Sequence, residues 1–346
     1  MEETKKLQRF SYSKVDTFKQ CGWKYKLVYE DGNFISKGSI ATEFGTLIHY
    51  IEETMAHTII SFERLDYDKL IDLLLTVNIE SDKEKVYGAN ILRNKYAKEW
   101  FELDKNGKNY EDKLNEYINT GIYRLRDYLI ANPDFEILAI EQEFDLTIDN
   151  YIFHGFIDRA FRNVVTGEIF LEDIKTWTKD LDKDVLTTPM QLAIYSLAAQ
   201  ELYNTDLDKI HCFYELPLWN KRYSAGTKGF VNRSLKKIKT LLEDIANEKF
   251  EPNPSPLCHW CDFCHTNPNQ PEEGKNLCPY FSKWTRESKD FSVEYEWLGI
   301  ENHDRILEAF INKNSKPLKS NITIQKNSSK LDVNNSDSNI RVYIFR

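Results

Sequence analysis

The fold is decided by residues 137–177, ILAIEQEFDLTIDNYIFHGFIDRAFRNVVTGEIFLEDIKTW. Apolar and polar residues alternate through most of this stretch, which is the period of a β-strand. The pair Asp149-Asn150 is turn-like, and NVVTG at 163–167 makes a second turn before the last alternating segment. We therefore expect three strands that form an antiparallel meander.

Segments with helical spacing of apolar residues lie on both sides of the meander in the sequence. FGTLIHYIEETMAHT at 44–58 precedes it, and the strongly apolar PMQLAIYSLAAQELY at 189–203 follows it. KIHCFYELPL at 209–218 then reads as a further strand, and residues 234–248 form a last amphipathic helix. Near the start, residues 11–29 predict a short helix. This order predicts an α/β fold in which helices flank a sheet.

Composition indicates where the remaining segments begin and end. Residues 59–132 are rich in Leu, Tyr, Lys and Glu with helical periodicity and few breakers, which predicts a helical insertion. Four of the six cysteines lie within residues 250–285. Asn, Ser and Lys dominate much of residues 313–346 before the apolar end IRVYIF, so we expect a flexible polar tail, whose last residues either dock onto a partner or add an edge strand. Residues 1–312 would then form the main domain.

The overall charge neither favours nor excludes nucleic acid, because 46 Lys and Arg residues face 55 Asp and Glu residues, for a net charge of -9. Any DNA-binding surface must be local, whereas carboxylates suit hard divalent cations. The first residues lack the apolar core of a signal peptide, and no run approaches the roughly 18 apolar residues of a membrane helix. We expect a cytoplasmic protein without membrane association, whose cysteines are not paired as disulfides.

Asp158, Asp173 and Lys175 form the constellation with the clearest chemistry. Side chains two apart on a strand share a face, so Asp173 and Lys175 project together, and a hairpin can bring Asp158 beside them. Two carboxylates can hold a divalent cation that activates water, while a lysine orients that water or stabilises charge during phosphodiester hydrolysis. The alternative interpretation is a solvated strand face with a surface ion pair. The apolar strands around both aspartates favour the site, because a buried, unpaired carboxylate is unfavourable.

Six segments, in order, match the pattern of a known family: SYSKVDTFKQC, GTLIH, GFIDR, EDIKT, MQLAIY and the late cysteines. On these segments, from Ser11 to Tyr280, the chain resembles the RecB-like branch of the PD-(D/E)xK nucleases, near the CRISPR-associated RecB-like exonucleases and the AddB nuclease domain. The resemblance implies a restriction-endonuclease-like α/β fold with a central mixed sheet flanked by helices. It also implies a DNA nuclease dependent on Mg²⁺ or Mn²⁺. Ile157 departs from the pattern, because it replaces the proline of the family's name.

The resemblance assigns a role to each residue of the constellation. His49, Asp158 and Asp173 would bind the metal, with the backbone carbonyl of Ile174 as a further ligand. Lys175 would be the catalytic lysine. The predicted metal centre therefore joins a helix before the meander to the strands that carry the aspartates.

Gln191 and Tyr195 match a Gln-x-x-x-Tyr helix that, in this family, lies beside the site and positions the lysine or the DNA. They are one helical turn apart. Without the resemblance, Gln191 would read as an ordinary polar residue on a core helix and His49 as a hydrogen-bonded core histidine. Glu143, in the strand before Asp158, is a further candidate to assist the metal.

Five cysteines form a metal-type cluster: Cys21, Cys258, Cys261, Cys264 and Cys278. Thiolates suit Zn²⁺ or an iron-sulfur cluster, and the spacing alone does not choose between them. The resemblance points to a [4Fe-4S] cluster held by Cys21, Cys258, Cys261 and Cys278, with Zn²⁺ as the alternative. Cys264 is the spare thiol, and it can replace Cys278 because the loop between the two is longer than the family's usual spacing.

The expected function is that of a DNA nuclease, a single-strand or end-specific exonuclease in DNA repair, recombination or phage DNA processing. The sequence contains no GxxxxGK[ST] segment to supply a motor, so a helicase, a single-strand-binding protein or a recombinase would be a separate partner. Trp177, Tyr195 and Trp219 can stack on unpaired bases or can be core residues. The alternative function is a non-catalytic DNA-binding or assembly subunit that keeps the fold as a scaffold.

Overall fold

The computed structural model describes the chain in segments, which are residues 8–35, 38–61, 79–80, 86–104, 106–121, 123–177, 183–226, 229–253, 255–264, 267–275, 277–278, 280–284, 291–296, 323–327, 330–334 and 340–345. Residues 62–78 and 81–85 of the predicted helical insertion lie outside the described residues. Much of the predicted polar tail does so too, beginning with residues 313–322.

Contacts within the chain separate two units. Residues 1–12 and 37–238 form the first, which we call the sheet unit. Residues 13–36 and 239–346 form the second, which we call the cysteine unit. The predicted metal centre falls in the sheet unit, and the predicted cysteine cluster falls in the cysteine unit.

A six-stranded mixed sheet forms the centre of the sheet unit. Its strands are β1 (Gln8–Phe10), β4 (Phe135–Ile148), β5 (Tyr151–Asn163), β6 (Ile169–Ile174), β7 (Ile210–Leu216) and β8 (Lys221–Ala225). As the alternating sequence predicts, β4, β5 and β6 are antiparallel neighbours. β7 runs parallel to β6 and antiparallel to β8, which makes the sheet mixed. The short β1, which the sequence analysis did not predict, pairs in parallel with β5.

Strand register brings the charged residues of the meander together. The pairs on either side of them place Glu141 of β4 opposite Asp158 of β5. Between β5 and β6, Arg159 pairs with Glu172, and Asp173 is the next residue of β6. Three carboxylates therefore line up across three adjacent strands.

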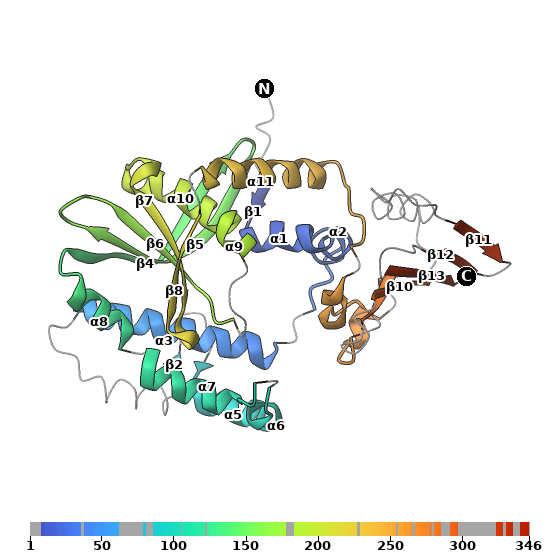
Figure 1. Ribbon diagram of the computed structural model, residues 1–346, viewed down its shortest axis with the longest axis horizontal. Coiled ribbons are helices and arrows are strands. Elements are labelled where there is room, and N and C mark those ends of the chain that lie inside the picture. Colours follow the sequence, from blue (N-terminus) through green and yellow to red (C-terminus); the bar gives the residue numbers. More distant parts are fainter. Residues whose placement is uncertain are drawn as a thin grey trace. The chain divides into compact units, whose positions relative to one another are not determined.

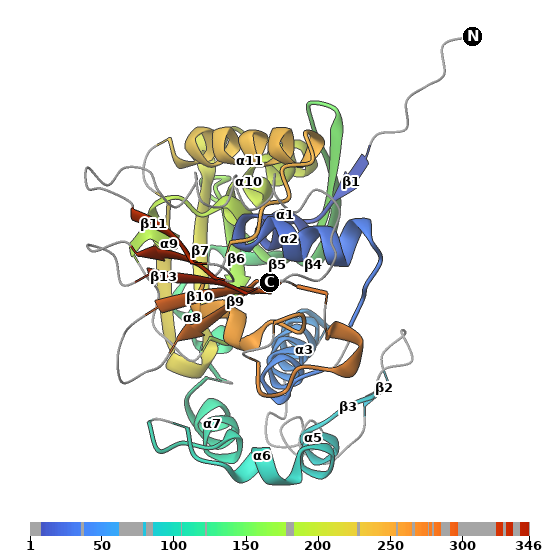
Figure 2. The ribbon, with the colours of Figure 1, turned by 90° about the vertical axis from the view of Figure 1, so that its right-hand side faces the viewer.

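Two helices cover opposite faces of the sheet, as Figure 1 and Figure 2 show. On one face, α3 (Ile40–Ser61) shares an apolar cluster with Phe161 of β5. On the other face, α10 (Met190–Tyr203) contacts Cys212 of β7 through Ser196, whose hydroxyl lies 3.1 Å from the sulfur. The predicted mixed sheet flanked by helices is therefore confirmed.

Shorter elements complete the sheet unit. In the region predicted to be a helical insertion, the described residues form β2 (Ile79–Glu80), β3 (Val86–Tyr87), α5 (Ala89–Lys95), α6 (Ala97–Phe101), α7 (Tyr110–Glu116), η2 (Tyr117–Gly121) and α8 (Arg124–Ala131). The β2–β3 pair departs from the predicted helices, in line with the strand preference of β-branched Ile79 and Val86. The connections around α10 contain α9 (Lys183–Thr187), η3 (Leu207–Lys209) and η4 (Pro217–Trp219). Helix α11 (Phe230–Ala246) contains the division between the two units.

The cysteine unit combines short helices with a second sheet. Its helical elements are α1 (Tyr12–Gln20), α2 (Gly22–Tyr25), η1 (Lys26–Glu30), η5 (Pro256–Trp260) and η6 (Glu272–Gly274). The helix predicted for residues 11–29 is thus interrupted at Cys21. The sheet has the order β11-β12-β13-β10-β9. Its strands are β9 (Tyr280–Trp284), β10 (Phe291–Glu296), β11 (Thr323–Asn327), β12 (Lys330–Asn334) and β13 (Ile340–Phe345).

The region predicted to be a polar tail therefore contributes three strands to this second sheet. The apolar end IRVYIF forms β13, which pairs with β12 on one side and with β10 on the other. Its β-branched and aromatic residues favour a strand, whereas the Asn and Ser content suggested a flexible segment. No helix in the described part of the chain is long and apolar enough to cross a membrane.

Candidate metal centre

Asp158 occupies the point where β5 and β6 part. The last paired residues at this end are Arg159 and Glu172. Beyond them, the backbone N–H of Ile174 donates a 2.6 Å hydrogen bond to Asp158 Oδ2. The Asp158 carboxylate thus provides the hydrogen-bond acceptor that the Ile174 N–H would otherwise need from a neighbouring strand. Asp173, between Glu172 and Ile174, is fully buried. The local backbone therefore fixes both aspartates.

Lys175 is held by groups from three elements. Its ammonium lies 2.7 Å from Asp173 Oδ2 and donates to Gln191 Oε1 of α10 at 3.0 Å. Gln191 Nε2 in turn donates to the Tyr195 hydroxyl at 2.8 Å, which sets the amide with its oxygen toward the lysine. The backbone N–H of Lys175 donates to the carbonyl of Glu215 on β7 at 2.7 Å. The structure therefore links both predicted α10 residues to Lys175. Gln191 contacts the lysine directly, and Tyr195 contacts it through Gln191.

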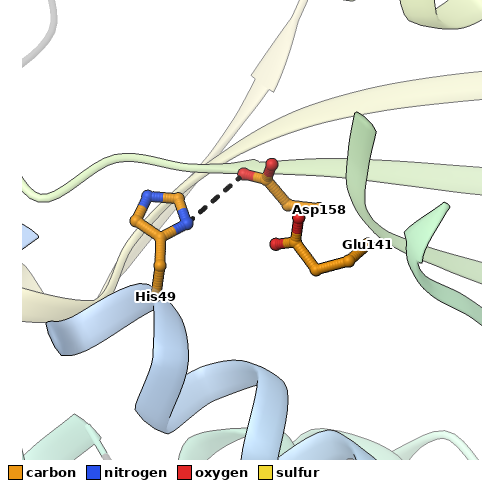
Figure 3. Close-up of side chains that lie close together, drawn as sticks. All are labelled: His49, Glu141 and Asp158. Atoms are coloured by element: carbon orange, nitrogen blue, oxygen red, sulfur yellow. Dashed lines mark ion pairs between the residues drawn. The ribbon is translucent and has the colours of Figure 1, made fainter. Parts of the chain in front are cut away.

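His49 approaches the aspartates from α3. Its Nδ1 lies 3.9 Å from Asp158 Oδ2, the contact drawn in Figure 3. Gly45, about one turn earlier, permits a close approach of the helix to the strand end, because a Cβ at this position would lie 2.8 Å from Thr176 Oγ1. The helix thus brings an imidazole to the carboxylates.

Glu141 completes a group of three possible metal ligands that the sequence analysis did not find. One donor atom from each of His49, Glu141 and Asp158 lies within 4.8 Å of the others, and Figure 3 shows the three side chains converging. Glu141 has a φ of 46°, a left-handed conformation that costs a non-glycine residue roughly 1–3 kcal/mol. Such strain is concentrated at functional sites. The signal was present in the two-residue turn at 149–150, because this turn sets the register that places Glu141 opposite Asp158.

Glu143, the carboxylate that the sequence analysis suggested instead, is not part of this group. Its side chain is 66% exposed, and its Oε1 lies 3.8 Å from His154 Nδ1. Alternation along a strand assigns Glu141 and Glu143 to the same face, so the pattern alone did not separate them. The left-handed backbone at Glu141 is the feature that distinguishes the two positions, and the sequence does not reveal it.

Burial and mutual repulsion control protonation at the centre. Burial raises the pKa of Asp158 to about 7, and the negative charge of Asp173 adds to the increase, while Lys175 and the Ile174 N–H oppose it. Burial lowers the pKa of His49, although the charge of Asp173 opposes that shift. His49 is therefore neutral near neutral pH and can offer a nitrogen lone pair to a metal.

The charges at this end of the sheet fit a divalent cation. Glu141, Asp158 and Asp173 supply carboxylates, and the ammonium of Lys175 lies against Asp173. The ammonium of Lys175, 2.7 Å from Oδ2, pairs with the buried carboxylate of Asp173. His49, Glu141 and Asp158 would hold the ion, because imidazole and carboxylate donors suit Mn²⁺, and carboxylates suit Mg²⁺.

Two further residues predicted to be ligands lie outside the group of three. Asp173 faces Lys175, which lies 2.7 Å from its Oδ2. Ile174 contacts Asp158 through its N–H rather than through its carbonyl. Their roles as ligands remain predictions.

A second set of charges, which we call the ionic network, lies on the opposite face of β5 and β6. Its members are Glu52, Glu172, Glu215, Arg124, Arg159 and Arg222. Arg159 lies 2.7 Å from Glu172 and 3.1 Å from Glu52 of α3. Arg222 lies 2.9 Å from Glu172. Since Arg159 follows Asp158 directly, the network ties α3 to the strand that carries the metal centre.

The predicted cluster cysteines lie in the cysteine unit. Cys21, Cys261 and Cys278 pack against one apolar cluster, whose buried members are Trp23, Leu27 and Phe263. Burial raises the pKa of Cys21 and, to about 11, that of Cys261, and the neighbouring Cys258 contributes to both shifts. Cys264 is buried but is not among the residues packed there. In the described segments, no three of these sulfur atoms lie within 4.8 Å of one another.

Comparisons with known proteins complete the description of the site. A family model described as the PD-(D/E)XK nuclease superfamily matches residues 9–266. No curated protein matches the chain. A solved structure titled "Crystal structure of SSO0001" is 14% identical, and the match covers 72% of this chain and 95% of that one with a TM-score of 0.27.

Proposed function

Because the chain belongs to the PD-(D/E)XK nuclease superfamily over residues 9–266, we propose that it is a deoxyribonuclease that hydrolyses phosphodiester bonds with Mg²⁺ or Mn²⁺. Membership implies a phosphodiesterase that acts on nucleic acid. The observation that carries the proposal is the convergence of His49, Glu141 and Asp158 close to the ammonium of Lys175. The ordered motifs further support assignment to the RecB-like branch.

Each group at the centre has a distinct proposed role. The cation held by His49, Glu141 and Asp158 would polarise the scissile phosphate and lower the pKa of a bound water. Lys175 stabilises negative charge that develops on the phosphate or orients the attacking water. Gln191 holds the lysine by its amide oxygen, and Tyr195 holds that amide in turn. Asp173 and the Ile174 carbonyl are proposed further ligands.

The finer assignment concerns substrate and context. We propose an exonuclease specific for single strands or DNA ends that acts in the cytoplasm in repair, recombination or phage DNA processing, with a helicase, single-strand-binding protein or recombinase as partner. Residues 1–312 would form the nuclease domain, with 59–132 as its insertion and 313–346 as an appended segment. The absence of a GxxxxGK[ST] motif in the sequence supports a separate motor.

The proposal is tested by digestion of end-labelled single-stranded and duplex DNA with Mg²⁺ or Mn²⁺ and with EDTA. Substrates blocked at the 5′ or the 3′ end distinguish exonuclease from endonuclease and give the polarity. Lys175→Ala should abolish metal-dependent cleavage, whereas Lys95→Ala, which removes an exposed lysine paired with Glu43, should not. Binding without cleavage by the wild type would instead support the non-catalytic subunit, and equal cleavage by both variants would remove Lys175 from the mechanism.

We also propose that Cys21, Cys258, Cys261 and Cys278 hold a structural [4Fe-4S] cluster. The shared apolar surroundings of Cys21, Cys261 and Cys278 support this set and favour Cys278 over Cys264. Backbone N–H groups lie 3.4 Å from the sulfurs of Cys21 and Cys258, a contact that stabilises metal-bound thiolates. Anaerobically purified protein should contain iron and sulfide and absorb light at about 400 nm. Colourless protein with stoichiometric zinc would favour the Zn²⁺ alternative.

A further inference from the structure

Two exposed tryptophans are joined by a hydrogen bond beside the metal centre. Trp177 follows Lys175 by two residues and is 40% exposed, and Trp219 of η4 is 41% exposed. The indole N–H of Trp219 donates to the backbone carbonyl of Trp177 at 2.7 Å. Large aromatic side chains usually bury their surface, so a bonded pair that stays exposed beside a candidate active site indicates a binding surface.

The backbone that carries Trp219 is fixed on its inner side. Pro217 is buried, and Leu218 packs against the apolar cluster of α3 and the neighbouring helices. Asn220, which ends the turn, has a φ of 49°, a left-handed conformation that asparagine tolerates. The turn therefore directs Trp219 outward while its neighbours anchor it. An aromatic surface that is already ordered loses little conformational entropy when a ligand stacks on it.

Positive charge accompanies the two rings. The ammonium of Lys175 lies 5.8 Å from the ring centroid of Trp177, and that of Lys221 lies 5.7 Å from the ring of Trp219. Lysines next to exposed aromatic rings are the combination by which proteins hold a single nucleic acid strand, because the cations contact phosphates and the rings stack on bases. A protein or lipid partner would not need this pairing beside a phosphodiesterase centre.

We propose that Trp177 and Trp219 form a stacking site for unpaired bases of the DNA strand whose phosphate lies at Lys175. This inference rests on the proposed function and makes its substrate class specific. In duplex DNA the faces of internal bases are covered by their neighbours, so a single strand offers its bases to the indoles where a duplex interior does not. The tryptophans thereby select single-stranded DNA at the point of cleavage.

The test measures binding apart from cleavage. The ligands are a fluorescently labelled short oligothymidylate and the same backbone with abasic residues, titrated by anisotropy with Ca²⁺ in place of the catalytic metal. The variants are Trp177→Ala and Trp219→Ala, the aromatic replacements Trp177→Phe and Trp219→Phe, and Phe101→Ala as a control. Phe101 is 56% exposed on α6 and is not part of the site.

Each tryptophan-to-alanine change should weaken binding of the oligothymidylate about tenfold or more, the effect expected for one lost base stack. The same changes should leave binding of the abasic strand within about twofold, and the phenylalanine variants should retain most of the affinity. Equal losses on both strands, or none on either, would overturn the stacking site. Base-dependent binding by a wild type that cleaves no DNA would refute the proposed nuclease function and keep the stacking site.

Discussion

The two faces of the β5–β6 pair hold buried charges in opposite states of balance. On the face toward α3, the ionic network sets three glutamates against three arginines. On the other side of these strands, Asp173 contacts Lys175, and Glu141 and Asp158 lie with His49 in the group of possible metal ligands. Arg159 and Glu172 therefore neutralise each other. The residues next to them, Asp158 and Asp173, carry charges of the same sign and repel each other.

The ionic network therefore has a structural role, whereas the metal centre has a chemical one. Burial of an ionised group is unfavourable unless an opposite charge or hydrogen bonds compensate it, so the ionic network is stable as the chain builds it. In the metal centre, burial and the charge of Asp173 raise the pKa of Asp158 to about 7, as burial and the charge of Glu172 raise the pKa of Glu215 to about 8 in the ionic network. A divalent cation supplies the missing positive charge.

The largest expected effect is on cleavage. Asp158→Asn should reduce metal-dependent DNA cleavage by about 10³-fold, equivalent to about 4 kcal/mol, because it removes a charge that holds the cation. The matched control is Asp145→Asn, which alters an exposed aspartate paired with Arg9 and His154 and should leave the rate within about twofold. Equal losses of activity in both variants would show that the charge of Asp158 has no specific role in cleavage.

The ionic network should respond in stability rather than in chemistry. Glu172→Gln should lower the free energy of unfolding by about 3 kcal/mol, because it leaves the buried Arg159 and its neighbour Arg222 without full compensation. Glu136→Gln breaks an exposed pair with Arg162 and should cost less than about 1 kcal/mol. Urea unfolding measures both variants, and similar values for the two would contradict the assignment of a structural role to the network.

Metal binding should stabilise the protein in a pH-dependent way. At a hundredfold excess over Kd, Mn²⁺ should add about 2.7 kcal/mol of stability. The pKa of Asp158 is about 7 in the folded protein and lower in the unfolded chain, so protonation of Asp158 stabilises the folded state. The metal-free protein therefore loses this stabilisation as pH rises through about 7. Below that pH a proton on Asp158 competes with the cation, so the Mn²⁺-induced shift in Tm should be larger at about pH 8 than at about pH 6. A shift independent of pH would exclude Asp158 as a ligand.

The smallest expected effect on stability is that of Asp173→Asn. It should change the stability of the metal-free protein by about 1 kcal/mol or less, because relief of the repulsion toward Asp158 offsets the loss of the buried ion pair with Lys175. Cleavage should fall in the same variant, since Lys175 loses its ion-pair partner. Unfolding in EDTA provides the measurement. Destabilisation similar to that of Glu172→Gln would show that repulsion between Asp158 and Asp173 does not offset this ion pair.

Local patterns predicted the part of the molecule that is built from consecutive residues. The alternation from 137 to 177 gave the meander, and the spacing of Asp173 and Lys175 placed them side by side. Glu141 was missed because its recognition requires the strand register to be counted through the turn, and its left-handed backbone leaves no trace in the pattern.

The ionic network could not be predicted, because its members belong to α3, α8 and four strands of distant sequence position. Glu52 and Arg124, for example, meet only after α3 and α8 have packed. Each residue alone reads as a surface charge, and no motif links them. Likewise, the contact between Trp177 and Trp219 depends on how η4 sits at the end of β7, so the sequence left both residues open between stacking and core packing.

The most direct measurement of the central claim is the anomalous difference density of Mn²⁺ in crystals of the protein. The account predicts a strong Mn²⁺ peak coordinated by His49, Glu141 and Asp158, and its loss in crystals of Asp158→Asn. Mn²⁺-dependent cleavage by a protein whose density shows the ion bound elsewhere, with these three side chains uncoordinated, would contradict the account.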